Sequence, residues 1–208
     1  MNINFSTLST TQVYHLMTQT IVPRPIAWIL TENESGDKNH RYNLAPFSYF
    51  NAVASDPPML MISVGTQVDG RAKDTLVNIT RTKQLVIHIA STNHIDELTQ
   101  SSATLPYGKS ELTASSLSTT PIDDFTLPRL SHAKLAFACN LDHIHLIGKT
   151  QSLVFAQIQS VYIADEVVQI DEARDRTLVD AALIDPLARL GGSNYAFLGE
   201  YVSRKRPD

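Results

Sequence analysis

Short apolar runs with the spacing of β-strands dominate the hydrophobic pattern of this chain. In residues 24–33, Ile26, Trp28 and Leu30 fall on one face of an extended segment, because the side chains of a strand alternate between its two faces. Alternation, or a high content of β-branched and aromatic residues, predicts further strands. These lie at about residues 44–53, 58–64, 84–91, 134–147 and 152–164.

The stretch NLAPFSYFNAVASDPPMLMISVG, residues 43–65, contains two of these strands. Successive prolines cannot both lie inside a hydrogen-bonded ladder, so the chain must turn at Asp56-Pro57-Pro58. The first strand also carries the small polar residues Ser48 and Asn51, and Ser55 follows it; a purely packing element would not need these residues. The pattern alone leaves open what these polar residues face.

Helical spacing occurs in two shorter places. Residues 9–20 predict a helix that Ser9 or Thr10 caps, and a second short helix follows Lys73. The inward-facing residues of the first helix are Val13, Leu16 and Met17. In the second helix, Asp74 or Thr75 is the expected cap. Leu76 and Ile79 are its inward-facing residues.

These elements predict a mainly β protein. About six strands at short spacing, with helices at the periphery, favour one antiparallel sheet that is closed or nearly closed into a barrel. One domain over residues 1–208 is the default at this length. Residues 92–120, which Pro106 and Gly108 interrupt, form a helical or irregular insert, and residues 177–201 are helical or irregular.

Composition and charge exclude several classes of protein. The net charge is −4, and the charges are spread widely, so no basic stripe for nucleic acid is present. No apolar run reaches the roughly 20 residues of a membrane span, and the start MNINFSTLSTTQ does not resemble a signal peptide. The single cysteine, Cys139, lies among apolar residues and is expected in the core. It fits a reducing compartment, so we expect a cytoplasmic location.

Lys73-Asp74-Thr75 is the most informative short motif. The first N–H groups of a helix are free and its dipole favours negative charge, so a lysine and a hydroxyl there make a plausible anion site. An ordinary capped helix with a solvated lysine is the alternative that these three residues leave open. Arg24, held between Pro23 and Pro25, is either a second anion-binding group or a surface arginine.

Other catalytic or metal-binding patterns are weak. His143 and His145 share one face of a predicted strand, but no third ligand is spaced with them, so we predict no metal site. No G-x-G-x-x-G, no G-x-x-x-x-G-K-[ST] and no G-x-S-x-G is present. Nothing in the residues therefore requires a hydrolase or a doubly wound nucleotide-binding sheet.

Four segments occur in an ordered series: VPRPIAW, NLAPFSYFNAVASDPPMLMISVG, KDTLVNI and LARLGGSNY. This series resembles the flavin reductase-like, FMN-binding split β-barrel family, which includes flavoredoxin-type proteins, over about residues 20–206. The resemblance implies a split barrel with Greek-key topology, a homodimer, and one FMN per subunit near the dimer interface. FMN carries its own redox chemistry, which agrees with the absence of a recognisable acid, base or nucleophile.

The resemblance also implies which residues bind FMN. The hairpin would line the isoalloxazine and the ribityl chain, and Lys73-Asp74-Thr75 would hold the phosphate, with Arg24 as an assistant. The C-terminal motif, which includes Gly191, would close over the site or meet the partner subunit. The implied cofactor-binding residues are Arg24, Phe47, Ser48, Tyr49, Asn51, Ala52, Val53, Ser55, Lys73, Asp74, Thr75, Arg189, Gly192 and Tyr195.

The implied activity is that of an NAD(P)H-dependent flavin reductase. Hydride would pass from NAD(P)H to FMN, and electrons would go on to a second flavin or to another small-molecule or protein acceptor. Many family members carry a His-Thr pair where this chain has Gln151-Ser152, which puts direct oxidation of NAD(P)H in question. Two alternatives stay open: an FMN-holding electron carrier reduced by a protein partner, and a non-enzymatic barrel that binds another phosphate ligand.

Overall fold

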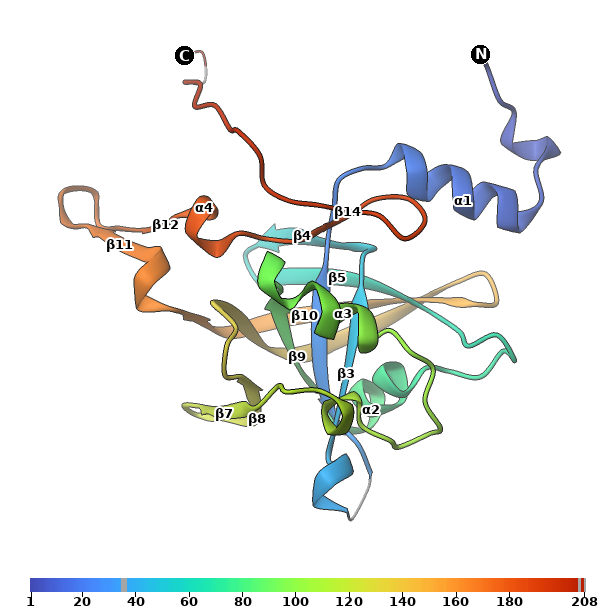
Figure 1. Ribbon diagram of the computed structural model, residues 1–208, viewed down its shortest axis with the longest axis horizontal. Coiled ribbons are helices and arrows are strands. Elements are labelled where there is room, and N and C mark those ends of the chain that lie inside the picture. The colour runs from blue at the N-terminus through green and yellow to red at the C-terminus, as the bar shows by residue number, and fades with distance from the viewer. Residues whose placement is uncertain (35–36, 206, 208) are drawn as a thin grey trace.

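A seven-stranded antiparallel sheet forms the body of the molecule (Figure 1). The structure is a computed structural model that describes residues 1–34, 37–205 and 207. Across the sheet the strand order is β3-β2-β6-β9-β10-β5-β4. In that order the strands are Tyr42–Phe47, Ala27–Glu32, Gln84–Ile89, Leu135–Ile147, Gln151–Ile163, Pro58–Gly65 and Phe50–Ser55.

The two end strands of this sheet, β3 and β4, are neighbours along the chain, separated only by Ser48 and Tyr49. The sheet must therefore curl until its two ends approach each other, which gives a nearly closed barrel. The order is not a simple meander, because β6 lies between β2 and β9 and β5 pairs with β10. The predicted mainly β barrel with peripheral helices is confirmed.

Apolar side chains fill the barrel and also cover its outer face. Successive residues of β2 enter two different clusters, with Ile29 inside the barrel and Trp28 and Leu30 outside it. The strand is thus buried on both faces, as its continuous apolar sequence requires. Trp28 Nε1 donates a hydrogen bond to Ser101 Oγ at 2.9 Å, which fixes the chain just after α3 (Ile95–Gln100).

Cys139 lies in the barrel core and is completely buried. Burial in apolar surroundings raises the pKa of its thiol to about 12. The residue is therefore a packing group, as predicted.

Several helices and short strands lie outside the seven-stranded sheet. None of the described helices is both long and apolar enough to cross a membrane. The other helices are α1 Thr10–Thr20, α2 Asp74–Thr82 and α4 Ala181–Ile184. The short strands are β1 Arg24–Pro25, β7 Thr119–Ile122, β8 Phe125–Leu130, β11 Val168–Asp171, β12 Arg176–Val179, β13 Ala188–Arg189 and β14 Tyr195–Ala196.

Two strand predictions need correction. The predicted single strand 44–53 is wrong, because the chain leaves β3 at Phe47 and begins β4 at Phe50, on the opposite edge of the sheet. Residues 177–201, for which only helical or irregular structure was expected, also contain most of β12 and the short strands β13 and β14. The strands predicted at 58–64, 84–91, 134–147 and 152–164 are confirmed to within two residues at each end.

Helix α1 begins as predicted but packs less deeply. Ser9 is its N-cap and forms a reciprocal capping box with Gln12. Its apolar residues Val13, Leu16 and Met17 are only half-buried, and Tyr14 is 57% exposed. The helix extends away from the barrel in Figure 1, so the expected inward packing is only partly found.

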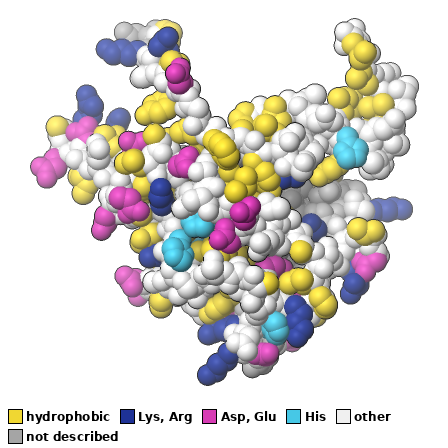
Figure 2. Space-filling model, in the orientation of Figure 1, with side chains coloured by type: hydrophobic (Ala, Val, Ile, Leu, Met, Phe, Trp, Pro, Cys, Tyr) yellow, Lys and Arg dark blue, Asp and Glu magenta, His cyan; other side chains and the backbone are white. Residues whose placement is uncertain are grey.

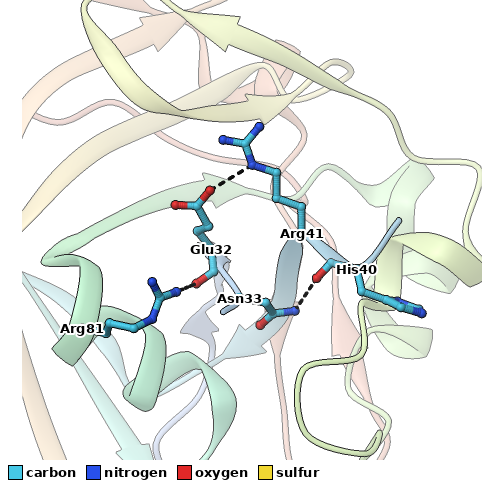
Figure 3. A network of polar contacts seen from close by, with 5 residues as sticks. All are labelled: Glu32, Asn33, His40, Arg41 and Arg81. Carbon is cyan, nitrogen blue, oxygen red and sulfur yellow. Dashed lines mark hydrogen bonds and ion pairs between the residues drawn. The ribbon is translucent and has the colours of Figure 1, made fainter. Parts of the chain in front are cut away.

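Helix α2 is held to the β2–β3 hairpin by polar contacts. At its C-terminal end, Arg81 donates to the carbonyl of Glu32, and Arg41 donates to the Glu32 carboxylate at 2.9 Å (Figure 3). Nearby, Asn33 Nδ2 donates to the carbonyl of His40 at 3.0 Å (Figure 3). Within the buried face of the helix, Asn78 Nδ2 donates to Asn33 Oδ1 at 2.8 Å. These contacts fix the helix axis, and therefore the position of its N-terminus, relative to β3.

Candidate functional site

Two adjoining cavities lie along β3, and we call them together the β3 hollow. The first, of about 230 Å³, lies between β3, the start of α2 and the segment after α3. The second, of about 150 Å³, lies between β3, Arg189 and Tyr195. Pro46, Phe47 and Ser102 line both cavities, so the hollow runs from α2 to the C-terminal motif.

The start of α2 forms one end of the hollow. Lys73 is the N-cap residue and makes no side-chain cap bond, so the prediction of Asp74 or Thr75 as the cap is wrong. No carboxylate of the described residues lies within ion-pair distance of Lys73, whose ammonium is 5.5 Å from the centre of the Phe47 ring. Burial lowers the pKa of Lys73. An unpaired, partly desolvated ammonium that lines the same cavity as the first turn of a helix favours an anion.

Thr75 contributes a hydroxyl with a defined orientation. Its side chain is buried, lines the first cavity, and accepts a hydrogen bond from Asn43 Nδ2 at 3.0 Å. Because a hydroxyl can accept and donate at the same time, this contact leaves the Thr75 proton available for an acceptor in the cavity. Asn43 belongs to the stretch that the sequence singled out, but only the fold pairs it with Thr75.

Two carboxyl groups hold the opposite wall, the segment from Ser101 to Glu111. Asp74 Oδ2 accepts from the Gly108 amide at 2.9 Å, and Glu111 Oε2 accepts from the Leu44 amide at 2.9 Å. Burial raises the pKa of Glu111 to about 7, and the nearby Asp74 charge acts in the same direction. Sequence reasoning missed Glu111, since the segment that carries it has no periodic pattern to place it.

Arg24 is buried, and its donors are directed mainly at backbone carbonyls. Nη1 donates to the carbonyls of Thr18 at 2.6 Å and Ile21 at 2.7 Å, and Nη2 donates to that of Leu190 at 2.8 Å. Its Nε reaches Ser48 Oγ at 3.4 Å. The residue joins the end of α1, the C-terminal motif and the corner between β3 and β4, and it lines neither cavity.

The C-terminal motif packs beside the second cavity. The Arg189 guanidinium lies 4.5 Å from the centre of the Tyr195 ring and donates to the carbonyl of Gly192. Gly192 has φ of +62°, which favours glycine. A Cβ on Gly191 would clash with Gln19 Cγ of α1 and lie 3.2 Å from its Cα, so this position also favours glycine. The motif is therefore shaped to approach α1 closely.

The residues predicted from the hairpin separate into two groups. Phe47 and Ser48 line the β3 hollow, and Tyr49 is half-buried at the corner. The residues on β4, which lie at the exposed edge of the sheet and line neither cavity, are Asn51, Ala52, Val53 and Ser55. Within one chain the structure thus brings Phe47 and Ser48 together with the Lys73 motif and the C-terminal motif, but leaves the β4 group exposed beside them.

His143 and His145 lie at an exposed part of β9, and His143 contacts neighbouring side chains. His143 stacks on Phe155 with ring centres 4.4 Å apart, and its Nδ1 lies 2.6 Å from the Asp142 carboxylate. In the part of the chain that the structure describes, no group of three or more His, Cys, Asp or Glu side chains could hold a metal ion. His143 and His145 are both exposed, in agreement with the solvated strand face favoured by the sequence.

Comparison with known proteins identifies the family. Residues 17–179 match the family described as "Flavin reductase like domain". The uncharacterized protein YwrF of Bacillus subtilis (strain 168) is 33% identical over 205 residues, which cover 96% of each chain.

Solved structures of related sequence share the fold. The 2-nitrobenzoate 2-nitroreductase NbaA of Pseudomonas fluorescens is 32% identical, with a TM-score of 0.86 over 100% of this chain and 96% of that one. Nitrilotriacetate monooxygenase component B of Bacillus cereus is 27% identical, with a TM-score of 0.88 over 98% of both chains. The chain therefore belongs to the flavin reductase-like family of split-barrel flavoproteins.

Proposed function

We propose that the β3 hollow binds FMN, with the phosphate against the start of α2. The observation that carries this proposal is that Lys73, which has no ion-pair partner among the described residues, lines the hollow together with Asp74 and Thr75 of the first turn of α2. The residues fit a phosphate monoester: Lys73 supplies charge, Thr75 supplies a hydroxyl proton, and the helix N-terminus supplies peptide N–H donors.

The ring system would extend along β3 toward Ser48 and the C-terminal motif. Phe47, Arg189 and Tyr195 offer flat or planar surfaces along that path. Bound FMN supplies the electron-transfer chemistry, and this chain's residues bind it, orient it and exclude water. Arg24 acts by fixing the corner at Ser48 rather than by reaching the phosphate.

A homodimer would complete the site at the β4 edge. Val53 of β4 is 52% exposed, and Ile21, Val22, Phe197 and Leu198 are exposed as well. Figure 2 shows hydrophobic side chains gathered where β14 and the chain after it cross the molecule. A second copy placed over this face would bury these side chains, and it would also cover the ring end of the hollow.

The reaction we propose is transfer of electrons from NAD(P)H through FMN to a flavin or another acceptor, in the cytoplasm. The alternative is an FMN-holding carrier that a protein partner reduces. The carrier is favoured by one feature: Gln151 stands where many family members have histidine, and its Oε1 accepts from Ser63 Oγ at 3.1 Å.

Anaerobic spectroscopy separates these two functions. The purified protein is loaded with FMN and mixed with NADH or NADPH. Rapid bleaching of the visible flavin band is expected for a reductase. Persistent colour would instead favour the carrier.

A further inference from the structure

The first cavity contains a cation and an acid that do not pair with each other. Lys73 and Glu111 both line it, and among the described residues neither has an ion-pair partner. One Glu111 oxygen is fixed by the Leu44 amide at 2.9 Å, so the carboxyl group is held at the wall of the cavity. An anion in this space would be attracted by Lys73 and repelled by an ionised Glu111.

We propose that Glu111 joins the phosphate site as a neutral carboxylic acid, so that binding of a phosphate monoester takes up one proton from solvent. In this form Glu111 donates its O–H to a phosphate oxygen and no longer repels the anion. The inference rests on the proposed FMN function and extends it, because it makes retention of the cofactor dependent on pH.

The charged surroundings of Glu111 agree with this role. Asp74 lies near enough to raise the Glu111 pKa, and its own carboxylate accepts from the Gly108 amide. The Leu44 amide favours the ionised form, but burial outweighs it, and the resulting pKa of about 7 allows Glu111 to change charge near neutrality. The titratable or charged groups around Glu111 are Lys38 and His40 of the short helix before β3, Tyr42 of β3, Lys73 and Asp74 at the start of α2, and Lys109, two residues before Glu111.

The sign of the effect follows from linkage. At pH 6 Glu111 is already mostly protonated, so binding needs no further proton there. At pH 8 it is mostly ionised and must be protonated first, which weakens binding. Because the pKa of Glu111 in the free protein is about 7, the affinity for FMN should fall about tenfold from pH 6 to pH 8. This fall is measured relative to a protein in which residue 111 cannot ionise.

The test compares FMN binding by the wild type and by Glu111→Gln from pH 6 to pH 8. Glutamine keeps an oxygen acceptor for the Leu44 amide, and the ionisation of FMN itself cancels in the comparison. The ratio of the wild-type Kd to the variant Kd is expected to rise about tenfold across this range. Glu166→Gln changes an exposed acid outside the hollow. The ratio of the wild-type Kd to the Kd of this control should stay constant from pH 6 to pH 8.

Calorimetry of the wild type in two buffers with different ionisation enthalpies gives a second readout, which does not depend on how the variant folds. At pH 8 FMN binding should take up about one proton. A flat Kd ratio, or no proton uptake at pH 8, overturns the inference while FMN binding itself stands. If no FMN binds at any pH, the proposed function fails as well.

Discussion

The α2 end of the β3 hollow and the neighbouring β4 edge differ in how much of their structure one chain supplies. At the α2 end, Asn43, Thr75, Asp74 and Glu111 all have hydrogen-bond partners in the same chain. At the β4 edge, the five residues Asn51–Ser55 are all exposed. The α2 end is therefore preorganised in the single chain, whereas the single chain leaves the β4 edge open to solvent.

This difference predicts where the binding energy of FMN is concentrated. Charge-assisted hydrogen bonds in a partly desolvated cavity are stronger than contacts on an exposed strand, where water can replace the protein group. Substitutions at the α2 end should therefore weaken FMN binding more than substitutions on β4.

The largest effect is expected for Lys73→Ala. Loss of the ammonium removes a charge-assisted contact worth about 1.5–3 kcal/mol, so the Kd for FMN should rise roughly 10- to 150-fold. Quenching of flavin fluorescence measures the affinity. Lys149→Ala, in the exposed turn between β9 and β10, is the matched control and should bind as the wild type does. A Lys73→Ala protein within twofold of the wild type would favour a different phosphate ligand or a different site.

A smaller effect on affinity is expected for Thr75→Val. The variant loses one hydroxyl donor to the phosphate, so the Kd should rise roughly fivefold, for about 1 kcal/mol. It also removes the acceptor of the buried Asn43 amide, which should lower the free energy of unfolding by about 1–3 kcal/mol without FMN. Thr75→Ser keeps the hydroxyl and should restore most of the affinity, as titration and urea unfolding can show.

Asn51→Ala examines the β4 edge. Among the described residues, the Asn51 side chain bonds only to the neighbouring Ala52 amide, at 3.0 Å. Its loss should raise the Kd for FMN by only roughly two- to threefold, for about 0.5 kcal/mol, because the site is exposed. If this variant weakens binding more than Lys73→Ala does, the proposed difference between the two regions is reversed.

The smallest effect on the chain itself is expected for Val53→Asp. An exposed substitution should change the free energy of unfolding of the chain by less than about 0.5 kcal/mol. The same change places a charge in the proposed interface, so sedimentation should show a shift from dimer to monomer. Ile170→Asp, on the exposed β11–β12 hairpin, should leave the oligomeric state unchanged. A wild-type protein that sediments as a monomer contradicts the proposed dimer.

The sequence predicted the elements whose partners are local or periodic. The Ser9 cap, the alternating faces of β2 and the turn at Asp56-Pro57-Pro58 all follow from neighbouring residues, and all are found. The presence of helix α2 was predicted on the same basis, together with the buried Ile79.

The features that the sequence analysis did not predict depend on residues far apart along the chain. Asp74 or Thr75 was expected to cap α2, but the Asp74 carboxylate instead accepts from the amide of Gly108, 34 residues further along the chain. Thr75 likewise pairs with Asn43, which lies 32 residues earlier. The break at Ser48-Tyr49 follows from closure of the barrel, which no local pattern records. The family resemblance named residues at both the α2 end and the β4 edge. It did not indicate that the first is hydrogen-bonded within the chain and the second exposed.

The central claim is that this chain binds FMN in the β3 hollow. The most direct test is the visible absorption spectrum of the purified protein after incubation with FMN and removal of unbound flavin by gel filtration. The account predicts a flavin spectrum that elutes with the protein at about one FMN per chain, and that is strongly reduced for Lys73→Ala. A protein that is colourless as purified, and that stays colourless after this treatment, contradicts the claim.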